Sequence, residues 1–480
     1  MARHSVSPMS VDGLVMHADI AARIHGDKNR VVSGITQDSR DVEPGDIYCC
    51  VRGESFDGHV FVTDAISRGA VAVLSEQFDV SIDPSIAQVV VSDVRAVLGR
   101  VASAVFRHPA SSLIIVGITG TNGKTTTASI LESLLSARGS RVSVIGTLTG
   151  TRTTPEAIDL HALLRDFVTD GVEYVVMEVS SHALQQHRVG GILFEVAVFT
   201  NLGHDHLDFH GDMENYFSEK SKLFSSEVAK QAVVNSDDVY GLRLLDAIDV
   251  PAVNFSLSNV SDIHIGLEKI SYQWNSVEIN IPIGGSFAVT NSLAAISAAS
   301  ALGLTKDEIV DGCGHVATVA GRFEVVSDSS DIDVVIDFAH TPEALQGLLI
   351  SARQITRASL VVVFGCGGDR DQAKRPLMGD IASRLADTVI VTSDNPRNEN
   401  PEIILDHIVS GAKANSGNIV RIVNRDEAIH SAILKAQNGD MVVIAGKGHE
   451  MTQESLGNFV PFSDVAVAKD ALRKRNGTPA

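Results

Sequence analysis

The stretch Val116-Gly-Ile-Thr-Gly-Thr-Asn-Gly-Lys-Thr-Thr126 decides the fold of the centre of this chain. It follows an apolar run, residues 113–116, that is typical of a buried parallel strand. A helical pattern of apolar residues comes next and ends near Gly139, a residue type that suits a helix C-terminus. The order of strand, glycine-rich turn and helix aims backbone N–H groups at phosphate oxygens. The stretch therefore predicts an α/β unit that binds a nucleoside triphosphate.

The residues of this loop have distinct expected roles. Lys124 is expected to reach the β- and γ-phosphates, and the Thr125 hydroxyl to face Mg²⁺. The strict pattern has glycine where Ile118 stands, so the match is to a variant. A glycine-rich turn is often only a tight turn, but Gly-Lys-Thr before a helix favours phosphate binding. The predicted loop comprises Gly120, Thr121, Asn122, Gly123, Lys124, Thr125 and Thr126.

Length and charge limit the classes of protein to which the chain can belong. Its 480 residues suggest about three domains of ordinary size. Hydrophobic residues make up 44% of the chain, which indicates a folded protein rather than a disordered one. The formal net charge of −20 argues against nonspecific binding to nucleic acid or to an anionic membrane surface. We therefore expect neither of these partners.

Cysteine usage and the uncharged segments indicate a cytoplasmic protein. Cys49, Cys50, Cys313 and Cys366 form no Cys-x-x-Cys pair, so buried reduced thiols are expected. The first 26 residues lack the apolar core of a signal peptide. The longest uncharged stretch, residues 279–305, contains proline, glycine and several serines, which makes it a poor membrane span. We expect it to form a turn followed by a helix packed inside the protein.

Three regions of different pattern predict three α/β domains. Residues 1–92 hold short strands and turns and are expected to form a smaller N-terminal α/β domain. Residues 93–325 contain the phosphate loop and predicted strands at 174–179 and 196–200. Residues 326–480 alternate strands at 334–338, 360–364, 388–392 and 441–445 with helices at 376–385 and 401–412. This alternation predicts a central doubly wound sheet and a C-terminal Rossmann-like α/β domain.

Polar residues follow the central strands at the edge where open α/β sheets place their ligands. Glu178 ends one predicted strand, and Asp205-His206 follows the next. A lone histidine near a loop is more often a hydrogen-bonded structural residue. In combination with Thr125, however, Glu178 and His206 favour a divalent-metal site, because Mg²⁺ binds carboxylate oxygens and phosphate. A histidine ligand would also admit Mn²⁺.

Several segments together resemble the Mur ligases, which use ATP to add amino acids to the UDP-linked precursor of peptidoglycan. They are Gly120-Thr-Asn-Gly-Lys-Thr-Thr126, Met177-Glu-Val-Ser-Ser-His182, Asn201-Leu-x-x-Asp-His-Leu-Asp208 and Asp337-x-x-His-Thr-Pro342. Their order and spacing cover most of the chain. Further segments resemble the branch of the family that adds the third peptide residue: Thr153-Thr-Pro155, Ser180-Ser-His-Ala-Leu-Gln-Gln-His-Arg188, Gly365-Cys-Gly-Gly-Asp-Arg370, Asp394-Asn-Pro-Arg397 and Gly446-Lys-Gly-His-Glu450.

The resemblance implies substrates, cofactors and a reaction. ATP would phosphorylate the γ-carboxylate of D-glutamate in UDP-MurNAc-L-Ala-D-Glu, and the amine of meso-diaminopimelate would attack the acyl phosphate. Two Mg²⁺ ions and no protein nucleophile are expected, because this chemistry depends on positioning and charge neutralisation. The N-terminal domain would bind the UDP end, the central domain ATP, and the C-terminal domain the amino acid. The protein is expected to be a monomer.

The resemblance also implies roles for individual residues. The catalytic residues would be Lys124, Lys220, His206 and Arg322. Outside the phosphate loop, ATP would contact Asn291, Arg322, Asp337 and His340. The metal ligands would be Thr125, Glu178, His206 and Lys220, the lysine as N6-carboxylysine. The UDP-MurNAc-dipeptide would contact Ser39, Thr153, Thr154, Ser180, Gln186 and Arg188. Diaminopimelate would contact Arg370, Asp394, Asn395, Pro396, Arg397, Gly446 and Glu450.

Simpler explanations exist for several of these residues. Ser39 could belong only to an Asx-type turn, and Thr153-Thr154 could only cap a helix that begins near Glu156. Asn291 could satisfy a helix terminus.

Three of the cationic residues in these sets also have simpler explanations. Arg322 could be a solvated surface arginine, and Lys220 reads on sequence alone as a solvated helix lysine. Arg397 could be incidental to a helix-capping turn formed by Asp394 and Asn395.

The chain departs from the family pattern in the uridine loop, which is usually His-Gln-x-Asp-Gly and here is Glu54-Ser-Phe-Asp-Gly58. A folylpolyglutamate synthetase shares the phosphate-loop variant, but segments 394–397 and 446–450 do not suit it. A switch GTPase would need an Asn-Lys-x-Asp motif, which the chain lacks. A non-enzymatic relative would be expected to have lost Lys124, Glu178 or His206, and the chain retains all of them.

Overall fold

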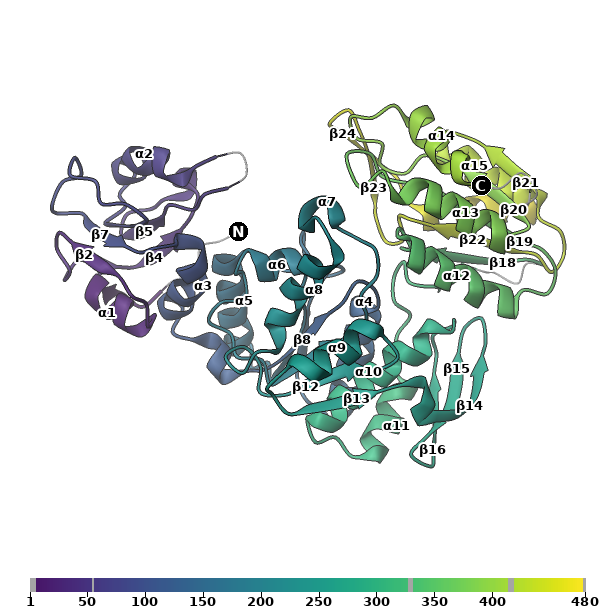
Figure 1. The fold of residues 1–480 in the computed structure, drawn as a ribbon, viewed down its shortest axis with the longest axis horizontal. Helices are drawn as coiled ribbons and strands as arrows, with labels where there is room; N and C mark the ends of the chain where they lie inside the picture. Colours follow the sequence, from purple (N-terminus) through teal and green to yellow (C-terminus); the bar gives the residue numbers. More distant parts are fainter. Residues whose placement is uncertain (1–5, 54–55, 327–330, 413–417, 478–480) are drawn as a thin grey trace.

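The computed structural model describes residues 6–53, 56–326, 331–412 and 418–477. Figure 1 shows three α/β bodies in chain order, with the central body between the N-terminal and C-terminal ones. Each body is built on its own sheet, of five, six and six strands respectively. This arrangement confirms the predicted three-part α/β fold. Residues 54 and 55 of the divergent uridine loop lie outside the described residues.

The central body carries a six-stranded parallel sheet in the order β13-β12-β11-β8-β10-β9. A separate antiparallel sheet, β14-β15-β16, lies beside it. The elements are β8 (Ile114–Thr119), α4 (Lys124–Ala137), β9 (Val142–Ile145), α5 (Ala157–Thr169), β10 (Tyr174–Glu178), α6 (Ser181–Gln185), β11 (Val196–Phe199), α7 (Leu207–His210), α8 (Met213–Ser221), β12 (Ala232–Asn235), α9 (Val239–Ala247), β13 (Ala252–Phe255), β14 (Val260–Ile265), β15 (Ile270–Trp274), β16 (Val277–Ile281), α10 (Phe287–Ala301) and α11 (Lys306–Gly314).

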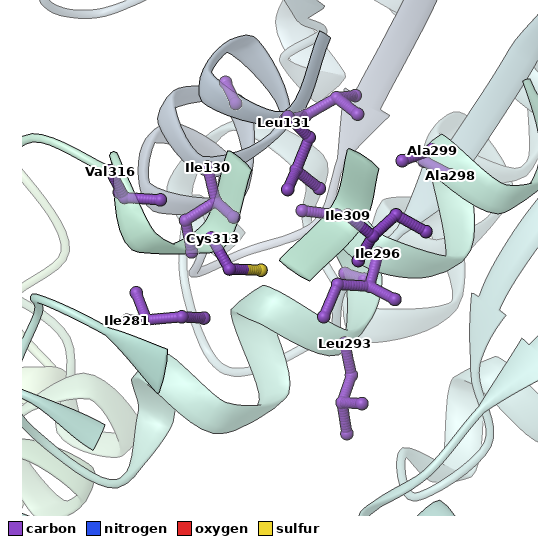
Figure 2. Close-up of a cluster of buried hydrophobic side chains, with 14 of the residues drawn as sticks. Ile130, Leu131, Ile281, Leu293, Ile296, Ala298, Ala299, Ile309, Cys313 and Val316 are labelled. Atoms are coloured by element: carbon purple, nitrogen blue, oxygen red, sulfur yellow. The ribbon is translucent and has the colours of Figure 1, made fainter. Parts of the chain in front are cut away.

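Helices cover both faces of this sheet, which explains why its strands are apolar on both sides. On one face, side chains of α4, α10 and α11 pack together in the cluster of Figure 2, with Leu131, Leu293 and Ile309 among its buried members. On the other face, α5, α8 and α9 cover the sheet. The strand order reverses at β8, so the carboxyl ends of β8, β10 and β11 meet at the place where such sheets bind ligands.

The C-terminal body has a second six-stranded sheet in the order β17-β18-β22-β19-β20-β21, parallel except for β17. Helices α12, α13 and α14 cover one face, and α15 and α16 the other. The elements are β17 (Glu324–Val325), β18 (Asp333–Asp337), α12 (Pro342–Ile355), β19 (Leu360–Phe364), α13 (Lys374–Leu385), β20 (Thr388–Val391), α14 (Pro401–Gly411), β21 (Asn418–Arg421), α15 (Arg425–Lys435), β22 (Met441–Ala445), β23 (Thr452–Ser455), β24 (Asn458–Pro461) and α16 (Asp464–Arg475).

The N-terminal body has a five-stranded sheet in the order β2-β7-β6-β5-β4. Its core also contains α1 and α3, together with Ala157 and Ala162 of α5, so α3 packs with the N-terminal sheet although it follows residue 92. The elements are β1 (Met9–Ser10), α1 (Val11–His17), β2 (Arg23–His25), β3 (Val31–Val32), β4 (Gly34–Thr36), β5 (Asp46–Cys49), α2 (Val62–Ser67), β6 (Ala72–Ser75), β7 (Ala87–Val90) and α3 (Val94–Val105).

Most predicted elements are found within one or two residues of their expected bounds. The strands at 360–364 and 441–445 are confirmed to the residue as β19 and β22. The four cysteines are buried and free, as predicted. The prediction for the uncharged stretch 279–305 is partly wrong, because its first residues complete β16 before α10 begins. Among the described residues, no helix is both long and apolar enough to cross a membrane.

Candidate active site

The phosphate loop lies between β8 and α4 and is shaped by two glycines. Gly120 and Gly123 have φ angles of +146° and +87°, which favour glycine. A Cβ atom on Gly123 would lie 2.3 Å from Oδ1 of Asn291, so α10 closes over the loop here. Lys124 Nζ donates to the carbonyl oxygens of Gly120 and Thr121, at 2.8 and 3.0 Å. The ammonium group is thus held inside the loop, where a bound phosphate would lie.

The neighbouring strand end contributes to the same loop. Asn122 N donates to Asn201 Oδ1 at 2.9 Å, and Thr121 Oγ1 accepts from Gly203 N at 2.9 Å. Asn291 lies within α10 rather than at its end, and its Oδ1 atom faces Gly123, the N-cap residue of α4. Thr126 is buried in the first turn of α4.

Glu178 is the acidic centre of the loop region. Its Oε2 atom accepts from Thr125 Oγ1 at 3.1 Å, and its Oε1 atom accepts from Thr147 N at 3.0 Å. Arg322 NH2 donates to Thr125 Oγ1 at 3.2 Å. Mg²⁺ in phosphate-transfer sites takes few protein oxygens in addition to phosphate and water. The Thr125 and Glu178 oxygens beside Lys124 therefore fit such an ion, and sequence reasoning missed Thr147 in this network.

His206 lies at the start of α7 in a cluster of histidines and acidic groups. Its Nε2 atom is 3.4 Å from Asp205 Oδ2, and His340 Nε2 is 3.8 Å from the same oxygen. The His206 and His182 rings are 4.9 Å apart. Desolvation by the surrounding protein lowers the pKa of His206, although 45% of its side chain is exposed. The neutral imidazole that results is the form that can bind a metal.

Among the described residues, no group of three or more His, Cys, Asp and Glu side chains forms a ready metal cluster. The sequence-predicted metal residues lie in three places around the loop. Thr125 and Glu178 form one pair, while His206 lies with Asp205, and Lys220 contacts Gly120.

Lys220 is not the solvated helix lysine that its sequence suggests. It is 1% exposed, and its Nζ atom donates to Gly120 O at 3.0 Å. The same nitrogen lies 4.6 Å from the centre of the Tyr216 ring. Burial, together with the nearby charge of Lys124, lowers the pKa of Lys220 well below its usual value. Burial thus shifts this lysine, which lies against the phosphate loop, toward its neutral form.

Arg322 follows the central body and lies against the C-terminal one. Its guanidinium group stacks over the Phe338 ring at 4.5 Å, and so the solvated-surface explanation is wrong. Both carboxylate oxygens of Asp337 accept backbone N–H groups, from Phe323 at 2.7 Å and from Ala339 at 2.8 Å. His340 extends from the same strand end toward Asp205. These contacts bring the predicted nucleotide residues of both bodies together.

The predicted dipeptide residues of the central body form one hydrogen-bonded group. Thr154 Oγ1 donates to Glu178 O at 2.9 Å and accepts from Ser180 N at 3.1 Å. Arg188 donates to Thr154 O at 3.0 Å and to Gln186 Oε1 at 2.7 Å. The capping explanation for Thr153-Thr154 is wrong, because α5 begins at Ala157 with Glu156 as its N-cap.

The other two members of this predicted set make different contacts. Thr153 Oγ1 lies 3.0 Å from Thr147 Oγ1. Ser39 is buried in the N-terminal body, where Asp38 accepts from Arg40 N, so the predicted Asx-type turn is present.

The predicted amino-acid residues meet at the carboxyl ends of β20 and β22. Arg397 has a φ of +50° and donates from NH1 to Gly368 O at 2.7 Å. Its Nε atom lies 3.2 Å from Glu454 Oε2, an ion pair that sequence reasoning missed. The helix-capping explanation is wrong, because Asn400 caps α14.

Other loops contribute further residues of this predicted set. Asn395 Nδ2 donates to Glu450 Oε2 at 2.9 Å. Gly446 has a φ of +114°, and a Cβ atom there would lie 2.7 Å from Asp394 Oδ2. Pro396 is buried beside them, and Arg370 is exposed on the loop after β19.

Comparison with known proteins supports a common origin along the chain. Models of the Mur ligase family match residues 31–106 (Mur ligase family, catalytic domain), 118–299 (Mur ligase middle domain) and 321–448 (Mur ligase, glutamate ligase domain). A protein of Syntrophomonas wolfei named UDP-N-acetylmuramoyl-L-alanyl-D-glutamate--2,6-diaminopimelate ligase is 41% identical, covering 93% of this chain and 96% of its own. A protein of the same name from Gloeobacter violaceus is 43% identical over 92% of this chain and 94% of its own.

A solved structure agrees with these relatives. It is the structure of a protein that is also named UDP-N-acetylmuramoyl-L-alanyl-D-glutamate--2,6-diaminopimelate ligase. Its sequence is 33% identical, and the two folds superpose with a TM-score of 0.68 over 98% of this chain and 100% of the other. The matches to these relatives cover more than nine tenths of this chain. The chain belongs to the Mur ligase family.

Proposed function

We propose that the protein is an ADP-forming ligase that joins meso-diaminopimelate to the γ-carboxylate of D-glutamate in UDP-MurNAc-L-Ala-D-Glu. The proposal rests on two groups of residues that face each other across the junction between the central and C-terminal bodies. The phosphate loop with Lys124 and Glu178 faces the C-terminal body through Arg322, and that body holds Arg397 and Glu450 at its strand ends. The names of the relatives support this substrate pair.

The proposed reaction has two steps. A γ-carboxylate oxygen of the dipeptide attacks the γ-phosphorus of ATP, and ADP leaves. The free amine of diaminopimelate then attacks the acyl carbon, and phosphate leaves as the amide forms. Lys124 and Arg322 neutralise charge on the transferred phosphoryl group, and bound Mg²⁺ adds further charge neutralisation. No protein nucleophile is needed, because holding the reactants in line supplies much of the rate.

The buried position of Lys220 supports its proposed conversion to a carbamate. A neutral amine can attack CO₂ and release one proton, which yields an anionic carboxylate on the lysine. Such a carboxylate offers Mg²⁺ the oxygen ligand that an ammonium cannot provide. Lys220 and the His206 imidazole would then hold a second ion, and Thr125 and Glu178 would hold the first.

The remaining assignments follow the three bodies. The N-terminal body, with Ser39, would bind the UDP end, and Thr154, Ser180 and Arg188 would hold the dipeptide. A soluble cytoplasmic monomer is the proposed working form.

The experiment is a complete-mixture assay of the purified protein with ATP, Mg²⁺, UDP-MurNAc-L-Ala-D-Glu and meso-diaminopimelate. Phosphate release and the mass of the UDP-linked product are read together, with each component omitted in turn. The proposal expects both signals only in the complete mixture. Phosphate release without the tripeptide product, or no reaction at all, would overturn it.

A further inference from the structure

Lys447 is a fully buried charged residue in the amino-acid pocket that the proposed reaction leaves without a role. It follows β22 and is 0% exposed. Its Nζ atom lies 2.7 Å from Glu450 Oε2 and 3.0 Å from Asn395 Oδ1. A charge buried this deeply is costly unless it is paired and hydrogen-bonded, and these two contacts supply that compensation.

The lysine fixes the orientation of the Asn395 amide. An ammonium group can only donate hydrogen bonds, so the atom that faces it must be the amide oxygen. The same oxygen accepts from Glu454 N at 3.0 Å, which agrees with this assignment. The Asn395 NH₂ group is thereby turned toward Glu450, where it donates to Oε2 at 2.9 Å.

The lysine also fixes the Glu450 carboxylate. Both donors, Lys447 and Asn395, reach the same oxygen, Oε2. Among the described residues, no hydrogen bond to Glu450 Oε1 is found, and the side chain remains 33% exposed. One oxygen is therefore anchored inside the protein, and the other is left for a ligand.

We propose that Lys447 is a positioning residue that, together with Asn395, aims the Glu450 carboxylate at the distal ammonium group of the diamino acid, an inference that rests on the proposed function. Arg397 is held by other groups, the Glu454 carboxylate and Gly368 O, and it is linked to Asn395 through the Glu454 backbone N–H. Arg397 would grip the distal carboxylate, whereas the Lys447–Asn395–Glu450 triangle would recognise the amine beside it. Arg397 and Glu450 would therefore recognise two different groups, the carboxylate and the amine, on the same carbon atom.

The test compares meso-diaminopimelate with 2-aminopimelate, which keeps both carboxylates but lacks the distal amine. The ratio of their kcat/KM values measures recognition of that amine. Lys447→Met is expected to lower the ratio about tenfold or more, because a charge-assisted hydrogen bond is lost or misaimed. The ratio of meso-diaminopimelate to L-lysine, which reports the distal carboxylate, should change by less than about threefold. Lys474→Met, which removes a surface ion pair with Asp470 at 2.7 Å, is the matched control and should leave both ratios unchanged.

A purely structural role for Lys447 predicts a different result. Loss of packing alone would lower kcat/KM for all amino acids alike and leave the amine ratio unchanged, which would overturn the inference. If Lys447→Met does not fold, Lys447→Met/Glu450→Gln removes both charges together. That pair should match Glu450→Gln within about threefold, since the lysine acts through the glutamate. A further multiplicative loss in the pair would contradict positioning. If the wild-type protein does not use meso-diaminopimelate at all, the proposed function fails first.

Discussion

At the scale of the residue, the structure shows which polar side chains are buried, and sequence motifs alone could not predict this. Lys220 reads on sequence alone as a solvated helix lysine, and sequence analysis assigned Lys447 no role, yet both side chains are buried. Their environments depend on contacts with Gly120 and Asn395, which lie far away in the chain. Local pattern cannot report such contacts, because it records only sequence neighbours. The phosphate-loop residues could be predicted from the sequence, since strand, turn and helix follow one another there.

Replacing Lys220 should abolish activity by removing the proposed carbamate. Lys220→Ala is expected to be nearly inactive in the ligase assay, with partial recovery when formate is added as a small carboxylate ligand. The control is Lys222→Ala, a lysine 46% exposed and paired with Glu219 on the same segment, which should stay active. Full activity of Lys220→Ala without formate would rule the carbamate out.

His161 should make the folding stability of the protein decrease as the pH falls. It is 0% exposed, its Nε2 atom lies 2.8 Å from Gly190 O, and burial lowers its pKa to about 4. The unfolded chain takes up a proton as pH falls below about 6.5, whereas the folded protein does so only near pH 4. Folding stability should therefore fall across this window, by up to about 3 kcal/mol.

Urea unfolding of the wild-type protein and of His161→Gln from pH 7 to pH 4 measures this effect. The wild-type stability should fall more steeply than that of the variant, with the difference confined to this range. Parallel pH profiles would show that His161 does not contribute.

At the scale of the element, the parallel strands were predictable and the edges of the fold were not. β19 and β22 are continuous apolar runs because helices cover both of their faces, and this pattern identifies them in the sequence. The small antiparallel strands β14–β16 and β23–β24 were missed, since all are short and no residue of β14, β23 or β24 is buried. Glu454 was missed for the same reason, because it lies on β23. Its partner Arg397 lies in another loop.

The packing of α4 against α10 and α11 should control the stability of the central body, which carries the phosphate loop. Leu131 is 0% exposed in this cluster (Figure 2). Leu131→Ala removes buried methyl groups from a closely packed core and should cost about 2–5 kcal/mol. Leu242→Ala, at a position 51% exposed on α9, should cost less than about 0.5 kcal/mol. Urea unfolding midpoints compare the two, and equal shifts would contradict the assigned core.

At the scale of the whole molecule, two parallel sheets present their carboxyl ends to a shared junction. Gly321 lies at that junction with a φ of +65°, and a Cβ atom there would lie 2.2 Å from His449 N. The chain thus passes from one body to the other in close contact with the 446–450 loop, so nucleotide and amino-acid residues lie near one another. The sequence predicted both sheets and their motifs. It could not predict this junction, because no periodic pattern describes how two domains meet.

The most direct test of the central claim is a competition between amino acids in one reaction. The protein receives ATP, Mg²⁺, UDP-MurNAc-L-Ala-D-Glu and equal concentrations of meso-diaminopimelate and L-lysine, and mass spectrometry counts the two tripeptide products. A bidentate arginine–carboxylate pair in a partly desolvated pocket is worth about 2–5 kcal/mol, so the diaminopimelate product should predominate by at least about thirtyfold. Arg397→Ala should lose most of this preference while retaining ATP binding. Equal amounts of the two products from the wild-type protein would contradict the account.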